Sequence, residues 1–113
     1  MMDAKEKAIN KFKLALTILK IVEENKSKNN ELLVTSLRKL AASSDVEYAI
    51  IQRITSGKKD PQWTTVASII EGFNISFNEF FSVYENISDQ DLREYQLSIL
   101  KKGKPKIKAK KKK

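Results

Sequence analysis

The sequence predicts an all-α protein with a single domain, and three observations support this fold class. Gly and Pro are scarce, at three and two residues in a chain of 113. No segment alternates apolar and polar residues over the length of a strand. Apolar residues instead recur at spacings of three and four in several segments, which is the pattern of helices that bury one face.

The first helix is expected to begin at Asp3, because Asp3 and Glu6 have the spacing of a capping box. The buried stripe predicted for this helix contains Ala8, Ile9, Phe12, Ala15, Leu16, Leu19 and Val22. The polar run at residues 25–30 predicts a loop. Ser36 is suited to cap a second helix, while residues 31–35 fit either a preceding helical turn or the first part of a bent helix.

A third helix is expected at about residues 47–56, and Gly57 suits a left-handed terminator for it. A fourth helix is predicted from Pro61 to Asn74, and the capping-box sequence SFNE opens a fifth. The sequence SDQD opens a sixth, weaker helix at about residues 88–100. The aromatic residues expected in the core are Trp63, Phe73, Phe77, Phe80 and Phe81.

So few residues separate the second and third helices that they can form a tight corner, provided that their facing sides are apolar. The residues that meet this condition are Leu37, Leu40, Ala41, Val46, Ile51 and Ile54. The small side chain of Ala41 lets the two helices cross closely. Glu47 is expected to cap the third helix. The opposite flank of that helix then points outward, with Tyr48, Ala49, Gln52 and Arg53.

From about Ser36 to Phe81 the chain resembles the Cro/repressor-type helix-turn-helix family, also called the XRE family. The shared landmarks are LA at 40–41, the turn into Val46, IQRI at 51–54, GKKDP at 57–61 and the closing ISFNEFF. The resemblance implies a five-helix lambda-repressor-like domain at residues 1–87. An extra C-terminal helix at 88–100 follows it and is a possible dimer element.

Three features depart from the family pattern. Lys20 and Thr55 stand where the family often pairs an Arg of the first helix with a Glu of the recognition helix, so that ion pair is absent. Asp45 replaces the usual Gly of the turn, although Asp tolerates a left-handed conformation. The segment between the first and second helices is also longer than usual.

In this family the helix after the turn lies in the DNA major groove. The resemblance therefore implies a sequence-specific DNA-binding transcriptional regulator, most simply a repressor. By position, the base contacts fall to Tyr48, Ala49, Gln52 and Arg53, and the phosphate contacts fall to Thr35, Ser36, Arg38, Lys58 and Lys59. The expected partners are double-stranded DNA and a second copy of the chain in a homodimer, because the family pairs half-sites about one DNA turn apart.

The formal net charge of +8 is concentrated in one segment. Residues 101–113 hold nine Lys and no acidic residue, which leaves 13 basic against 14 acidic residues, or −1, in the rest of the chain. This polybasic tail is predicted to be disordered. It suits nonspecific attraction to nucleic acid, while a purely solubilising role and attraction to a membrane surface remain open alternatives.

The chain has no His and no Cys, which excludes disulfides, thiolate chemistry and the usual zinc ligands. It also lacks a Gly-rich phosphate loop. We therefore expect no enzymatic activity, no metal site, no cofactor and no small-molecule ligand. With neither a secretory signal nor a membrane-spanning segment, the expected location is cytoplasmic and associated with a bacterial nucleoid. The alternative function is a non-enzymatic protein-interaction or dimerisation module with a polybasic nucleic-acid anchor.

Overall fold

Residues 3–103 are described in a computed structural model, and all of the regular structure among them is helical. The six helices are α1 (Ala4–Ser27), α2 (Leu37–Ser44), α3 (Tyr48–Thr55), α4 (Trp63–Phe73), α5 (Phe77–Glu85) and α6 (Asp89–Gly103). The predicted all-α class is confirmed for these residues. None of these helices is long and apolar enough to cross a membrane. The polybasic tail was predicted to be disordered from residue 101, but residues 101–103 belong to α6; the rest of the tail, residues 104–113, lies outside the described residues.

Several helices begin where a side chain bonds the free backbone groups of the first turn. Asp3 accepts a hydrogen bond from the backbone N–H of Glu6, whose side chain accepts one from the N–H of Asp3, so the predicted capping box is present. Ser76 and Glu79 repeat this arrangement at the start of α5, and Ser36 caps α2. Each cap of this kind stabilises a helix by about 0.5–2 kcal/mol.

Helices α2, α3 and α4 stop at residues with a left-handed backbone. Asp45 ends α2 and Asn74 ends α4, each with a φ of 61°, while Gly57 follows α3 with a φ of 79°. The sequence predicts all three positions. A left-handed residue ends a helix because it turns the chain away from the helix axis while still bonding the last carbonyls.

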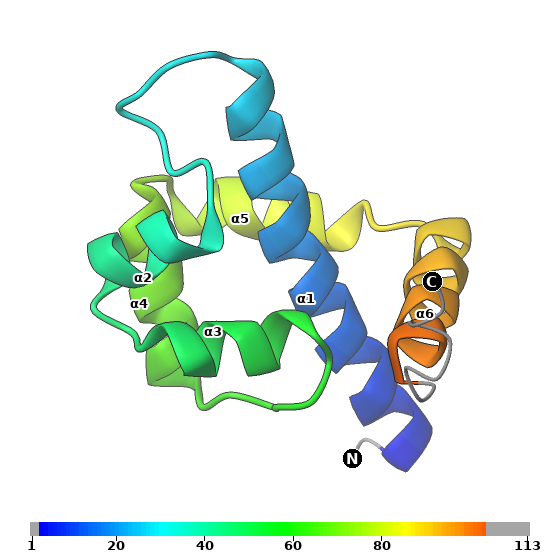
Figure 1. The fold of residues 1–113 in the computed structure, drawn as a ribbon. Coiled ribbons are helices and arrows are strands. Elements are labelled where there is room, and N and C mark those ends of the chain that lie inside the picture. Colours follow the sequence, from blue (N-terminus) through cyan, green and yellow to red (C-terminus); the bar gives the residue numbers. More distant parts are fainter. Residues whose placement is uncertain (1–2, 104–113) are drawn as a thin grey trace, which may run out of the picture.

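Helix α1 runs through the middle of the molecule (Figure 1). Helices α2, α3 and α4 gather on one side of it and α6 lies on the other side. α1 contacts α3, α5 and α6, while α2 contacts α3 and α4. The core lies where these elements meet, and its fully buried aliphatic and aromatic side chains include Ile18, Leu40, Ile51, Ile54, Ile69, Ile70 and Phe80.

The buried stripe of α1 differs from the predicted one. Leu14, Ile18 and Ile21 are buried although they lie outside that prediction, whereas Phe12 and Leu16 are only partly buried. α1 contacts three other helices, so apolar residues occur around most of its circumference. Under these conditions the spacing of apolar residues does not select a single face.

The connection from α1 to α2 also corrects the prediction of a loop at residues 25–30. α1 continues to Ser27, and the buried side-chain amide of Asn25 donates to the backbone carbonyl of Val34 at 2.9 Å. This bond ties the end of α1 to the segment that leads into α2. Residues 31–35 contain no helix, so they are a separate segment rather than a helical turn before α2.

The prediction of a buried aromatic cluster is wrong for two of its members. Trp63 is 57% exposed and Phe77 is 38% exposed, whereas Phe73 and Phe80 are buried. Trp63 stacks on Phe81 with ring centroids 6.3 Å apart, and it tilts against Phe77 at 5.8 Å. Trp63 and Phe77 are the first residues of α4 and α5, so their rings lie at the rim of the core.

Helix α4 approaches the end of α2 closely at Gly72. A Cβ atom at this position would lie 2.6 Å from the Cβ and 2.8 Å from the Cα of Ser44, so only Gly fits without movement. Ser44 is the last residue of α2. The contact between these two residues therefore sets where the chain turns into α3.

Helix α6 packs on α1 of the same chain. The buried ring of Tyr95 lies 5.7 Å from the ring of Phe12, measured between centroids. Near the start of α6, the Nζ atom of Lys20 lies 3.4 Å from Oδ2 of Asp91. The sixth helix that the sequence predicts is therefore present, with one face against α1.

Candidate nucleic-acid interface

Helices α2 and α3 meet at a corner formed by residues 45–47. Asp45 is left-handed, with φ 61° and ψ 29°, and its N–H donates to the carbonyl of Ala41 at 3.0 Å. The N–H of Val46 then donates to the hydroxyl of Ser44 at 3.3 Å. The side chain of Val46 packs against the core, as predicted. The chain therefore changes direction within three residues, and these bonds fix the position of the first residue of α3.

Helix α3 buries one flank and exposes the other. The fully buried side chains are those of Ile51 and Ile54. Three of the four predicted base-contacting residues are exposed, namely Ala49, Gln52 and Arg53. Ile50 is partly buried and packs against the core, so it does not belong to the exposed flank. The outer surface of α3 therefore presents the polar side chains of Gln52 and Arg53 beside the small side chain of Ala49.

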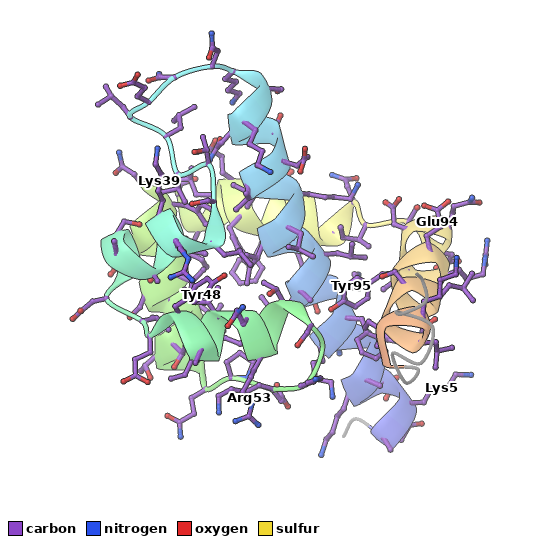
Figure 2. The ribbon with its side chains drawn as sticks, in the orientation of Figure 1. Lys5, Lys39, Tyr48, Arg53, Glu94 and Tyr95 are labelled. Atoms are coloured by element: carbon purple, nitrogen blue, oxygen red, sulfur yellow. The ribbon has the colours of Figure 1, made fainter. Side chains whose placement is uncertain are left out.

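The fourth predicted base-contacting residue, Tyr48, is partly buried and pairs with Arg38 of α2. The guanidinium carbon of Arg38 lies 4.2 Å from the centroid of the Tyr48 ring, which is a cation–π distance. Figure 2 shows Tyr48 near the start of α3 and Arg53 farther along the same helix. The pair brings a predicted phosphate-contacting residue against a predicted base-contacting residue across the corner.

The predicted functional residues at the starts of α2 and α3 have different surroundings. The hydroxyl of Ser36 accepts the N–H of Lys39 at 3.1 Å, so this predicted phosphate contact also caps α2. Thr35, just before it, is partly buried. Glu47 holds the N-cap position of α3, as expected, but its side chain makes no capping hydrogen bond.

The end of α3 carries the two remaining predicted phosphate contacts. Lys58 is exposed and Lys59 is partly buried. The N–H of Lys58 donates to the carbonyl of Arg53 at 2.9 Å, across the left-handed Gly57. This bond fixes the direction in which the chain leaves α3, and therefore the position of Lys58 and Lys59.

The end of α3 is also held by a residue that the sequence marks only as apolar. The buried Tyr95 of α6 donates its hydroxyl proton to the carbonyl of Thr55, the last residue of α3, at 2.6 Å. Burial raises the pKa of Tyr95 to about 12, so the hydroxyl remains a donor well above neutral pH. No local pattern connects two residues that are 40 positions apart.

Lys20 is paired with α6. Its ammonium group lies 3.4 Å from the Asp91 carboxylate. The pKa of Asp91 is lowered, first by the hydrogen bond from the backbone N–H of Ser88 and to a lesser degree by Lys20. Lys20 and Thr55 stand at the two positions where the resemblance expects an ion pair, and each is joined instead to a residue of α6.

Residues 38–59, which include the corner and α3, carry a net positive charge. The sequence from Arg38 to Lys59 contains five basic and two acidic residues, and the two acids, Asp45 and Glu47, both lie in the corner. Within residues 3–103, no three acidic side chains gather closely enough to hold a metal ion. The exposed groups of the face are mainly hydrogen-bond donors, which suit the acceptor atoms of a polyanion.

Comparison of the chain with models of protein families, with curated proteins and with solved structures finds no match.

Proposed function

We propose that this chain is a sequence-specific DNA-binding transcriptional regulator of the Cro/repressor helix-turn-helix type, with α3 as its recognition helix. One observation carries the proposal: a corner of three residues is followed by a helix whose inner flank is buried and whose outer flank is open and polar. The major groove of B-DNA is about 12 Å wide and admits one α-helix. In a lambda-repressor-like domain, this outer flank is the part that enters the groove.

The exposed flank has side chains that can distinguish base pairs. Arg53 can bond O6 and N7 of guanine, and Gln52 can bond N6 and N7 of adenine. The methyl group of Ala49 suits contact with the methyl group of thymine. Each bidentate pair discriminates against a wrong base by about 1–3 kcal/mol. Tyr48, which lies against Arg38, would contact DNA at the edge of this surface.

Phosphate contacts are assigned to both ends of the flank. On the α2 side they are Thr35, Ser36 and Arg38, and after α3 they are Lys58 and Lys59. Such contacts set the register of the protein on DNA without reading sequence. The polybasic tail at 101–113 would add sequence-independent attraction. Steric exclusion of RNA polymerase is the simplest mechanism, which makes the regulator a repressor.

The regulator is proposed to act as a homodimer, because one recognition helix covers too few base pairs. The outer face of α6 is the proposed contact. Leu97 and Leu100 are 59% and 62% exposed there, and their spacing of three places them on one side of the helix. A second copy would present its own α3 to the next major groove, about 34 Å away along the DNA axis.

The test of base readout is the variant Arg53→Ala. A selection on random duplex DNA at two salt concentrations first identifies the bound sequence. Arg53→Ala should then weaken binding to that sequence by about 5- to 150-fold, the equivalent of 1–3 kcal/mol, with a much smaller loss on random duplexes. Lys26→Ala is the matched control, because it removes one positive charge from an exposed site in the last turn of α1, outside the flank of α3. Equal losses on both kinds of duplex would argue against base readout by Arg53.

A protein-interaction module is the second candidate. The observation that favours it is the exposure of large apolar side chains at Trp63, Leu97 and Leu100. Exposed apolar patches often mark protein contacts. If this is the whole function, the selection on duplex DNA returns no preferred sequence.

A further inference from the structure

We propose that α6 holds the C-terminal end of α3 in the position from which Lys58 and Lys59 contact DNA, and that Tyr95 is the positioning residue. The inference rests on the proposed function for its DNA readout. Three separate contacts carry it.

The first contact is a hydrogen bond to a helix end. The last carbonyls of an α-helix have no partner inside the helix. At the end of α3 the carbonyls of Gln52, Arg53 and Ile54 receive backbone N–H groups from residues 56–58. The carbonyl of Thr55 receives the hydroxyl of Tyr95 at 2.6 Å. A side chain of α6 therefore completes the hydrogen bonding of the α3 terminus.

The second contact closes around Gly57, the residue at which the chain turns toward Lys58. A Cβ atom on Gly57 would lie 3.0 Å from Cε1 of Phe12 and 3.1 Å from Cδ1 of Ile99. Phe12 belongs to α1 and Ile99 to α6, so side chains of both helices lie close to the turn. Any shift of α6 would therefore be transmitted to the segment that carries Lys58.

The third contact anchors α6 itself. Lys20 of α1 pairs with Asp91 at 3.4 Å, and the ring of Phe12 lies against that of Tyr95 at 5.7 Å between centroids. α1 in turn contacts α3. Figure 2 shows Tyr95 on the side of α6 that faces α1. Both α3 and α6 therefore pack on α1, and Tyr95 of α6 reaches the C-terminal end of α3.

The first test compares two conservative variants by amide hydrogen exchange. Tyr95→Phe removes the hydroxyl bonded to Thr55 and keeps the ring. Tyr84→Phe is the matched control, because it removes a hydroxyl that donates to Oδ1 of Asn10 at 2.9 Å, at the contact of α5 with α1. Tyr95→Phe should speed exchange of the amides of residues 56–58 by about three- to tenfold relative to the wild type and to Tyr84→Phe. Unchanged exchange at those amides would overturn the proposal.

The second test measures DNA binding against salt. If Lys58 and Lys59 lose their position, Tyr95→Phe should bind the selected duplex about three- to tenfold more weakly. Its slope of log affinity against log salt should also be shallower by roughly one phosphate contact, or about 0.9. Tyr84→Phe should change neither quantity, because a general loss of stability does not alter the number of phosphates contacted.

The outcomes separate the two proposals. If Tyr95→Phe speeds exchange but keeps the wild-type affinity and salt slope, the positioning of Lys58 and Lys59 is overturned while the Arg53→Ala result still decides the proposed function. If the wild type selects no duplex, the proposed function fails and the claim about DNA contact fails with it. The exchange data then decide alone whether α6 holds the end of α3.

A double-mutant cycle gives an independent check on the contact at Gly57. Gly57→Ala introduces an unfavourable backbone, a close contact with Phe12, and a clash with Ile99 that alone is relieved by shortening Ile99. Ile99→Ala in the Gly57→Ala background should restore the part of stability lost to the clash. The two substitutions should therefore couple by at least about twofold in the unfolding equilibrium constant. Additive effects would contradict the contact of α6 with this turn.

Discussion

Gly72→Ala sets two effects of a single methyl group against each other. In a helix that packs against nothing, replacing Gly by Ala stabilises the helix by about 1 kcal/mol. In this protein the new Cβ atom would lie 2.6 Å from the Cβ, 2.8 Å from the Cα and 2.9 Å from the N of Ser44. Two of these three atoms are backbone, so α2 itself has to move.

The steric effect is expected to outweigh the gain in helix propensity. Overpacking a well-packed core costs about 1–3 kcal/mol, and contact with backbone places this case in the upper part of that range. After the propensity gain, the net loss is about 1–2 kcal/mol. For a domain of this size, the melting temperature should fall by roughly 4–16 °C. Thermal unfolding followed by circular dichroism measures this change.

The control for helix propensity is Thr64→Ala, at an exposed position of the same helix. It should leave the melting temperature unchanged or raise it slightly. A Gly72→Ala protein that melts at or above the wild-type temperature would refute the reasoning, because it would mean that α2 and α4 have room for a methyl group at this crossing. Because Ser44 precedes the corner, the destabilised variant should also bind DNA more weakly at a temperature where it is folded.

Two further predictions concern aromatic residues. Trp63 is the sole Trp of the chain and is 57% exposed, so iodide should quench its fluorescence in the folded protein almost as efficiently as in the unfolded chain; strong shielding would contradict its surface position. The pKa of Tyr95 is raised by burial to about 12 from an ordinary value of 10.0, so the folded state favours the protonated hydroxyl. That contribution to stability is complete below about pH 10 and is lost as the pH rises toward 12. Stability measured by denaturant unfolding should fall over this range, and less steeply for Tyr95→Phe; parallel curves would contradict the assignment.

The helix ends were predictable because their causes are local. Ser36 and Ser76 bond backbone groups three residues away, and Gly57 and Asn74 adopt the left-handed conformation that ends a helix. Such effects depend on neighbours in the chain and are therefore visible in the sequence. The inner residues of the corner were predictable for a related reason, since the spacing of apolar residues in two short helices leaves few arrangements that bury the apolar faces of both helices.

The contacts that the sequence does not reveal join residues far apart in the chain. The bond from Tyr95 to Thr55 depends on where α6 lies, and no spacing rule places a sixth helix. The crossing at Gly72 likewise depends on the angle between two helices. Trp63 has the large apolar side chain that is typical of core residues, but its place at the start of α4 puts it on the rim of the core. Composition predicts that a side chain tends to be buried, while its position in the fold decides whether it is.

The two candidate functions would use different surfaces of the molecule. The chemistry of the surface on α3 therefore indicates which of the two functions this helix suits. A protein partner on α3 would have to remove water from Arg53 and Gln52, and charged side chains are depleted from the centres of protein interfaces for this reason. The exposed large apolar side chains lie outside α3, with Leu32 before α2, Trp63 on α4, Phe77 on α5, and Leu97 and Leu100 on α6. A groove of DNA presents polar base edges and phosphates, which match the exposed flank of α3. Substitution of Arg53 should therefore impair DNA binding and leave self-association unchanged, whereas Leu97→Glu should impair self-association first and weaken DNA binding only through the loss of the second copy.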